Sequence, residues 1–85
     1  MERTEIKEKV VAVLCKVLGN KAEDITDDAS LRNDLGADSL DMVETLMDIE
    51  KVFGINFPPA EEDSLRDADT LKQIIDILDK KVNEF

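Results

Sequence analysis

Hydrophobic residues recur at helical spacing in three stretches of the chain, at residues 5–18, 39–53 and 70–83. In each stretch apolar side chains return every three or four positions, which lays a stripe along one face of a helix. The first stripe consists of Ile6, Val10, Val13, Leu14 and Val17, and the last of Leu71, Ile74, Ile75, Leu78 and Val82. No stretch alternates convincingly in the manner of a β-strand. The pattern therefore predicts an all-α domain.

Turn and capping residues bound these stretches and add a fourth helix. Gly19 and Gly54 follow the first two, and glycine readily adopts the left-handed conformation that ends a helix. The residue pairs that suit helix starts are Asp38 with Asp41 and Thr70 with Gln73. Within residues 59–66, a proline followed by acidic residues favours a helix of one or two turns. We expect three long helices and one short helix.

The connection over residues 19–38 is long for a structureless loop in a small domain. It contains Ile25, Leu31 and Leu35, which we expect to pin it to the helices. We also expect it to hold a helical turn of its own. A long, anchored loop that delivers the chain to a helix start is a common place for function.

Composition limits the domain count and the classes of function. Eighty-five residues suffice for one small core, so we treat residues 1–85 as a single domain and expect a monomer. The net charge of −10 argues against nucleic-acid binding, because phosphate recognition needs a basic surface. The chain has no histidine, the commonest general base and a usual metal ligand, so we do not expect an enzyme.

Cys15 is the only cysteine, so it cannot form an internal disulfide or a zinc cluster. A chain without a disulfide framework is typical of a reducing compartment, and we expect the cytoplasm. Cys15 lies beside the first apolar stripe and is expected to be a small buried hydrophobe. The longest apolar run, residues 10–15, is far too short to span a membrane. No basic stretch followed by an apolar one opens the sequence, so we expect no signal peptide.

Negative charge is concentrated in the middle third of the chain. Residues 23–50 contain ten acidic side chains and one basic side chain, Arg32, for a net charge of −9. A calcium-binding EF-hand loop is excluded by the spacing, because a loop beginning at Asp24 has Thr26 at its third position and Ala29 at its sixth. We therefore expect no dedicated metal site there, only diffuse attraction of divalent ions.

The second predicted helix carries two apolar stripes rather than one. Met42, Leu46, Ile49 and Phe53 form a stripe that suits a core-facing side. Leu40, Val43 and Met47 form another, turned by more than about 100° from the first and flanked by Asp41, Glu44 and Asp48. Three interpretations remain open for the second stripe: part of a wide core face, the wall of an interior cavity, or a docking surface with a charged rim.

The sequence around the start of this helix resembles acyl carrier proteins. The matching string is Leu35-Gly36-Ala37-Asp38-Ser39-Leu40-Asp41-Met42-Val43-Glu44, and it continues through Ile49 to Ile55. The resemblance implies an antiparallel four-helix bundle with a long first loop. It also implies that Ser39 carries 4′-phosphopantetheine, transferred from coenzyme A by a phosphopantetheinyl transferase (holo-acyl carrier protein synthase). Acyl chains would then travel as thioesters on this arm to enzymes of fatty acid synthesis.

The resemblance also suggests which surfaces serve partners and cargo. For docking to transferases, synthesis enzymes and acyltransferases with basic patches, we expect Asp38, Leu40, Asp41, Val43, Glu44, Met47 and Asp48. For the walls of an acyl pocket between the helices, we expect Leu46, Met47, Ile49, Ile55, Leu65 and Ile75. Helical periodicity alone does not separate such walls from ordinary core.

Two departures from the family pattern leave the pathway open. Lys51 stands where relatives often carry an acid, and the stretch between Leu65 and Leu71 is about three residues longer than usual. A carrier of another pathway, with D-alanyl, polyketide or aminoacyl cargo, is therefore an alternative. An acidic helical interaction module without a prosthetic group is another alternative.

Overall fold

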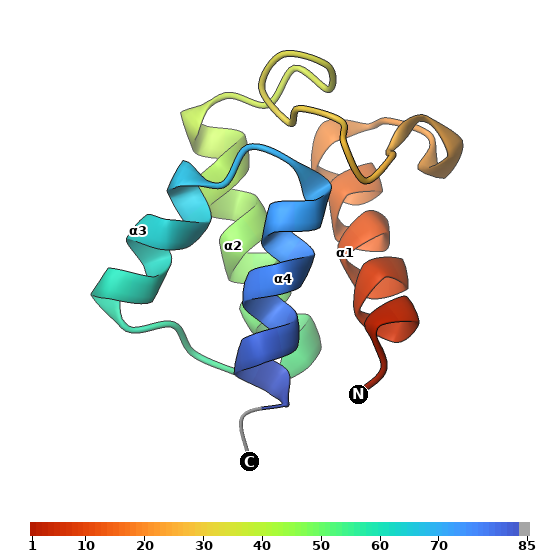
Figure 1. Ribbon diagram of the computed structural model, residues 1–85. Helices are drawn as coiled ribbons and strands as arrows, with labels where there is room; N and C mark the ends of the chain where they lie inside the picture. Colours follow the sequence, from red (N-terminus) through yellow and green to blue (C-terminus); the bar gives the residue numbers. More distant parts are fainter. Residues whose placement is uncertain (84–85) are drawn as a thin grey trace.

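The computed structural model describes residues 1–83, and they form four α-helices and no β-strand. The helices are α1 (Arg3–Leu18), α2 (Ser39–Phe53), α3 (Pro59–Asp67) and α4 (Leu71–Val82), with a short 3₁₀ turn, η1 (Ala22–Asp24), in the first loop. Successive helices run in opposite directions, so α1 and α3 ascend while α2 and α4 descend in the view of Figure 1. The predicted all-α fold with three long helices and one short helix is confirmed.

The helix starts follow the local signals in the sequence. Asp38 Oδ1 accepts a hydrogen bond from the Asp41 N–H (2.9 Å), and Asp41 Oδ2 accepts one from the Asp38 N–H (3.1 Å). This reciprocal capping box fixes the first turn of α2. Thr70 and Gln73 form the same arrangement at the start of α4. The helix predicted for residues 39–53 has these bounds in the structure, whereas α1 begins two residues earlier than predicted.

Helix α3 is longer than the one or two turns expected. Pro59 occupies its first position and the helix continues through Arg66 to Asp67, which makes about two and a half turns. Only residues 68–70 then connect it to α4. Of the five residues between Leu65 and Leu71, two therefore continue α3 and three form the connection.

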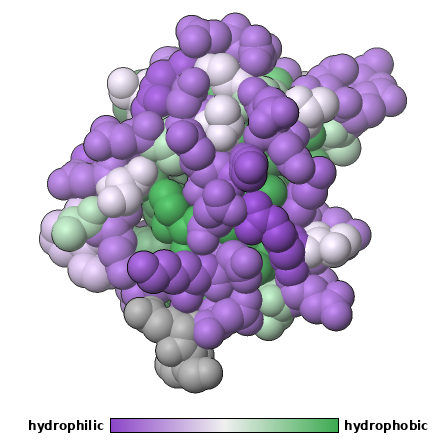
Figure 2. Space-filling model, viewed as in Figure 1, coloured by the Kyte–Doolittle hydropathy of each residue, from purple (hydrophilic) through white to green (hydrophobic). Residues whose placement is uncertain are grey.

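The core lies between the apolar stripes of α1, α2 and α4. Its fully buried side chains include Ile6, Leu14, Ile49 and Leu78. Cys15 packs against this cluster but is only half-buried, so it is less enclosed than expected. The surface in Figure 2 is mostly hydrophilic, with hydrophobic atoms visible in the recess between α3 and α4. Within the described residues, no helix combines the length and apolar character that crossing a bilayer requires.

The long first loop is anchored to the N-terminus of α4. Leu31 is fully buried and its N–H donates to the Asp69 carbonyl oxygen (2.7 Å). The Ser30 hydroxyl donates to the Asp69 carboxylate (2.8 Å). Ile25 is also buried, and Leu35 packs against the core from a half-buried position. The expected anchors are confirmed, and they fix where the loop delivers the chain to α2.

A salt bridge ties the same loop to α1. Lys7 Nζ lies 2.7 Å from Asp27 Oδ1. The hydrogen bond from Lys7 lowers the pKa of the Asp27 carboxyl below its usual value. The pair is exposed, so its contribution to stability is small beside the burial of Leu31.

We expect Leu31→Ala to destabilise the domain by about 2–5 kcal/mol, because it opens a cavity where the loop meets the core. Leu40→Ala is the matched control: Leu40 is 80% exposed, whereas Leu31 is fully buried. The Leu40→Ala substitution should change the free energy of unfolding by less than about 0.5 kcal/mol. Urea denaturation measures both values, and equal effects of the two substitutions would contradict the anchoring role of Leu31.

Candidate functional site

Ser39 is the first residue of α2, and it is exposed at one end of the bundle. Among residues 1–83, its hydroxyl has no hydrogen-bond partner. The capping box occupies the N–H groups of Asp38 and Asp41. The N–H groups of Ser39 and Leu40 have no acceptor inside the helix, because the first turn lacks preceding carbonyls. The hydroxyl therefore lies beside free backbone donors at the positive end of the helix dipole.

The charge around Ser39 has two opposing parts. Free N–H groups and the helix dipole favour an anion at this position. The carboxylates of Asp38 and Asp41 flank the hydroxyl and repel an anion, although each also accepts a backbone hydrogen bond. A phosphate attached to Ser39 would find donors close to its point of attachment and negative charge around them. This arrangement fits a group that is tethered at one atom and otherwise remains free.

The second apolar stripe of α2 faces solvent. Leu40 is 80% exposed, Met47 52% and Val43 39%, whereas Met42, Leu46 and Ile49 on the first stripe are buried. The interpretation as part of a wide core face is therefore wrong, because α1 and α3 pack on other sides of α2. We call the exposed stripe with its carboxylates the acidic apolar face, which comprises Asp38, Leu40, Asp41, Val43, Glu44, Met47 and Asp48.

The carboxylates of the acidic apolar face differ in exposure. Asp38 and Glu44 are exposed and Asp41 is half-buried. The side chain of Asp48 is only 18% exposed, and its Oδ2 lies 3.8 Å from Lys16 Nζ on α1. Asp48 is therefore partly covered and partly neutralised. The strongest free charge on this face lies in the first two turns of α2, close to Ser39.

A cavity of about 10 Å³ lies between α2, α3 and α4, at the place where an acyl pocket was expected. Of the predicted wall residues, the structure brings Leu46, Ile49 and Leu65 to this cavity. The other three lie elsewhere: Met47 is exposed on the acidic apolar face, Ile55 is half-buried beyond α2, and Ile75 is buried in the core. The remaining lining residues are Met42, Thr45, Arg66 and Ile74.

Thr45 is a site residue that the sequence did not reveal. It is 2% exposed and is the one buried polar side chain among the described residues. Its Oγ1 has no hydrogen-bond partner within residues 1–83. The only signal in the sequence is its position next to the core-facing stripe of α2, where an aliphatic residue would continue the apolar surface.

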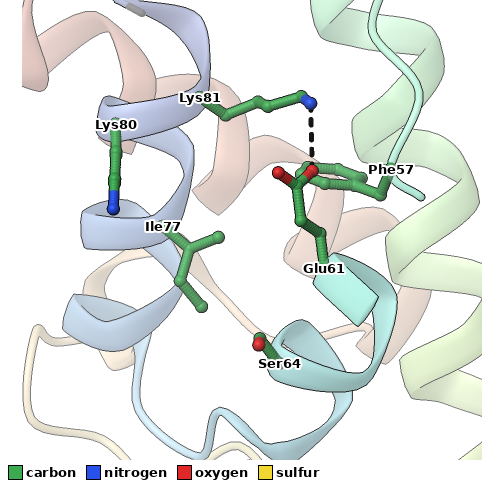
Figure 3. A pocket seen from close by; sticks show the side chains of 6 residues that line it. All are labelled: Phe57, Glu61, Ser64, Ile77, Lys80 and Lys81. Atoms are coloured by element: carbon green, nitrogen blue, oxygen red, sulfur yellow. Dashed lines mark ion pairs between the residues drawn. The ribbon is translucent and has the colours of Figure 1, made fainter. Parts of the chain in front are cut away.

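A larger hollow of about 210 Å³ lies between α3 and α4, near the beginning of α3. Figure 3 shows the Lys81 side chain reaching across this hollow toward Glu61 and lying above the Phe57 ring. Lys81 Nζ lies 2.9 Å from Glu61 Oε2. Lys80, Ser64 and Ile77 complete its lining. In Figure 1 the start of α2, which is Ser39, lies at the opposite end of the bundle from the beginning of α3 and the end of α4. The Glu61–Lys81 ion pair therefore fastens α3 to α4 away from the candidate site.

Comparison with known proteins matches this chain to one family. Residues 8–78 match the family model described as the phosphopantetheine attachment site. A protein named acyl carrier protein from Amoebophilus asiaticus is 41% identical over 81 residues, which cover 95% of this chain and 98% of that protein. Another of the same name from Guillardia theta is 42% identical over 82 residues, covering 96% and 98%. A third, from Thermosynechococcus vestitus, is 38% identical with the same coverage.

Divalent ions should stabilise the domain by screening its own charge. No three acidic or cysteine side chains among residues 1–83 converge to hold a metal ion, yet residues 23–50 carry a net charge of −9. We expect millimolar Mg²⁺ to raise the melting temperature, because it reduces repulsion between these carboxylates. Differential scanning fluorimetry at constant ionic strength measures the effect. A melting temperature that does not change with added Mg²⁺ would contradict it.

Proposed function

This chain belongs to the acyl carrier protein family of phosphopantetheine attachment domains, and from that premise we propose that Ser39 is the attachment residue. Acyl carriers are not enzymes; they hold acyl groups as thioesters on the thiol of 4′-phosphopantetheine. The observation that carries the proposal is the exposed Ser39 hydroxyl at the first position of α2, beside free backbone N–H groups.

The chain's own groups position the Ser39 hydroxyl but do not activate it. No histidine is present, and the nearest carboxylates, Asp38 and Asp41, each accept a backbone hydrogen bond. The proton of the hydroxyl must therefore be accepted by the phosphopantetheinyl transferase when the phosphodiester forms. The carboxylate of Asp38 is exposed next to Ser39 and is suited to help hold the metal-bound substrate of that transferase.

The acidic apolar face is the surface we propose for partner enzymes. A central group of exposed apolar side chains inside a charged rim is typical of protein interfaces. The charges attract enzymes with basic patches and speed their encounter, while the small apolar area lets the complex separate again. A carrier that must visit several enzymes in turn needs both properties. Asp48 contributes less than the other acids, because Lys16 already lies beside it.

We propose fatty acid synthesis as the pathway, with transferases, synthesis enzymes and acyltransferases as the partners. The family relatives and the acidity of α2 support this assignment over a D-alanyl, polyketide or aminoacyl carrier. The proposed compartment is the cytoplasm, which is compatible with a single unpaired cysteine. We propose that the domain acts as a monomer, because a carrier must leave its docking face free for each enzyme.

The acyl chain is proposed to enter between α2, α3 and α4. The cavity there is about 10 Å³, which is room for no more than one water molecule. A chain of several methylene groups therefore requires α3 to move away from α2. Helix α3 is suited to this movement, because Leu65 is its one buried residue. The Glu61–Lys81 ion pair would keep its first turn attached to α4 while the rest of the helix moves.

Replacement of Ser39 should abolish attachment. We expect the protein to gain the mass of one phosphopantetheine group when it is incubated with coenzyme A and a promiscuous transferase, and Ser39→Ala to gain none. Ser64→Ala is the matched control, since Ser64 is also an exposed helical serine and should leave the mass gain intact. Intact-mass spectrometry measures this, and a gain of mass in the Ser39→Ala protein would refute the assignment.

Reversing one charge on the acidic apolar face should slow partner enzymes. We expect Glu44→Lys to lower the rate of modification by the transferase roughly tenfold at low salt, because it weakens electrostatic attraction during encounter. The difference should shrink as salt screens the charges. Glu8→Lys makes the same change of charge on α1, where Glu8 is exposed away from α2. Equal rates for the two variants at low salt would contradict the proposed docking surface.

A further inference from the structure

The hydroxyl of Thr45 is buried without a partner at the cavity between α2, α3 and α4. Thr45 lies six residues after Ser39, so it is about 9 Å farther along the helix axis. It is 2% exposed, and its neighbours in the lining include the aliphatic side chains of Leu46, Ile49 and Leu65. A buried hydroxyl that has lost its contacts with water and gained none is destabilising.

The protein itself offers this hydroxyl few partners. Threonine in a helix can donate to the carbonyl four residues earlier, yet Thr45 Oγ1 makes no such bond. Arg66 is the one other polar residue of the lining, and it is exposed, so it borders the cavity toward solvent. The Arg66 carbonyl oxygen is already occupied by Arg32.

Water is also a poor partner at this position. The cavity volume of about 10 Å³ lies at the lower limit for a single water molecule. A buried water needs two to four polar groups around it, and this lining is mainly aliphatic. A hydrogen-bond partner for the Thr45 hydroxyl would therefore have to be supplied by a molecule that enters the cavity.

We propose that Thr45 is a specificity-determining residue that makes the pocket favour acyl chains bearing a hydroxyl or oxo group over fully saturated chains. The proposal rests on Ser39 as the tether, since the chain reaches the cavity from that end of α2. The Thr45 hydroxyl donates to an oxo oxygen, or exchanges a hydrogen bond with a hydroxyl on the chain. A saturated chain instead seals the hydroxyl against methylene groups and leaves it unpaired.

The test compares the stability that different cargoes confer. Carriers are loaded from coenzyme A thioesters with eight-carbon chains that are saturated or bear one hydroxyl at position 3, 5 or 7. The melting temperature of each loaded protein is measured against the unloaded form of the same variant. The variants are Thr45→Val, which removes the hydroxyl, Thr45→Ser, which keeps it, and Thr26→Val, which makes the same change at an exposed loop position.

In the wild-type protein, at least one hydroxylated chain should raise the melting temperature about 4–8 °C more than the saturated chain does. The difference should persist in Thr45→Ser and Thr26→Val. In Thr45→Val it should vanish or change sign, because the pocket then has no polar group to pair. Equal effects of saturated and hydroxylated chains in the wild-type protein, or a preference that survives in Thr45→Val, would overturn the proposal.

Loading is checked separately, so that failure of the tether and failure of the pocket are distinguishable. A protein that gains no mass at Ser39 refutes the attachment site. The role of Thr45 is then tested by coupling the same chains through a thioether to Ser39→Cys in a Cys15→Ala background. Loss of the hydroxyl preference in Thr45→Val in that protein would support the specificity role, and its retention would overturn it.

Discussion

The reciprocal capping of Asp38 and Asp41 is the interaction on which the candidate site depends. It consumes the N–H groups at positions 38 and 41, fixes where α2 begins, and leaves Ser39 exposed between them with free backbone donors at its side. The same carboxylates supply the negative charge that surrounds the hydroxyl. In the role that we propose for Ser39, the stability of the helix start and the environment of the attachment site therefore depend on the same two side chains, Asp38 and Asp41.

Helix α2 serves the core and the surface at once. Its buried stripe packs with α1 and α3, and its exposed stripe lies open to solvent inside a rim of carboxylates. The long first loop makes this possible, because its hydrogen bonds to the start of α4 hold the beginning of α2 at the end of the bundle. Repulsion among the acids of residues 23–50 is offset by burial of residues such as Leu31, so the fold tolerates a concentrated negative charge on the surface that we propose for docking.

Much of the fold could be predicted because its signals are local. The bounds of α2 follow from Asp38, Asp41 and Gly54, and the anchoring of the loop follows from Ile25 and Leu31. The start of helix α1 was predicted two residues too late, because Glu2, which precedes the helix, makes no side-chain cap and so gives no capping signal in the sequence. The site was harder to predict beyond Ser39. Whether Met47 faces a cavity or solvent depends on which sides of α2 its neighbours cover, and the missing partner of Thr45 depends on three helices at once.

We propose that the first turn of α2 presents Ser39 as the tether for an acyl-carrying arm. Phosphorus NMR and two-dimensional amide NMR of the protein, recorded before and after treatment with coenzyme A and a transferase, test this role of Ser39. One new phosphodiester phosphorus signal should appear, with the largest amide shifts at Ser39 and Leu40 and only small shifts in α1. A phosphodiester accompanied by its largest shifts elsewhere, or spectra that do not change at all, would contradict it.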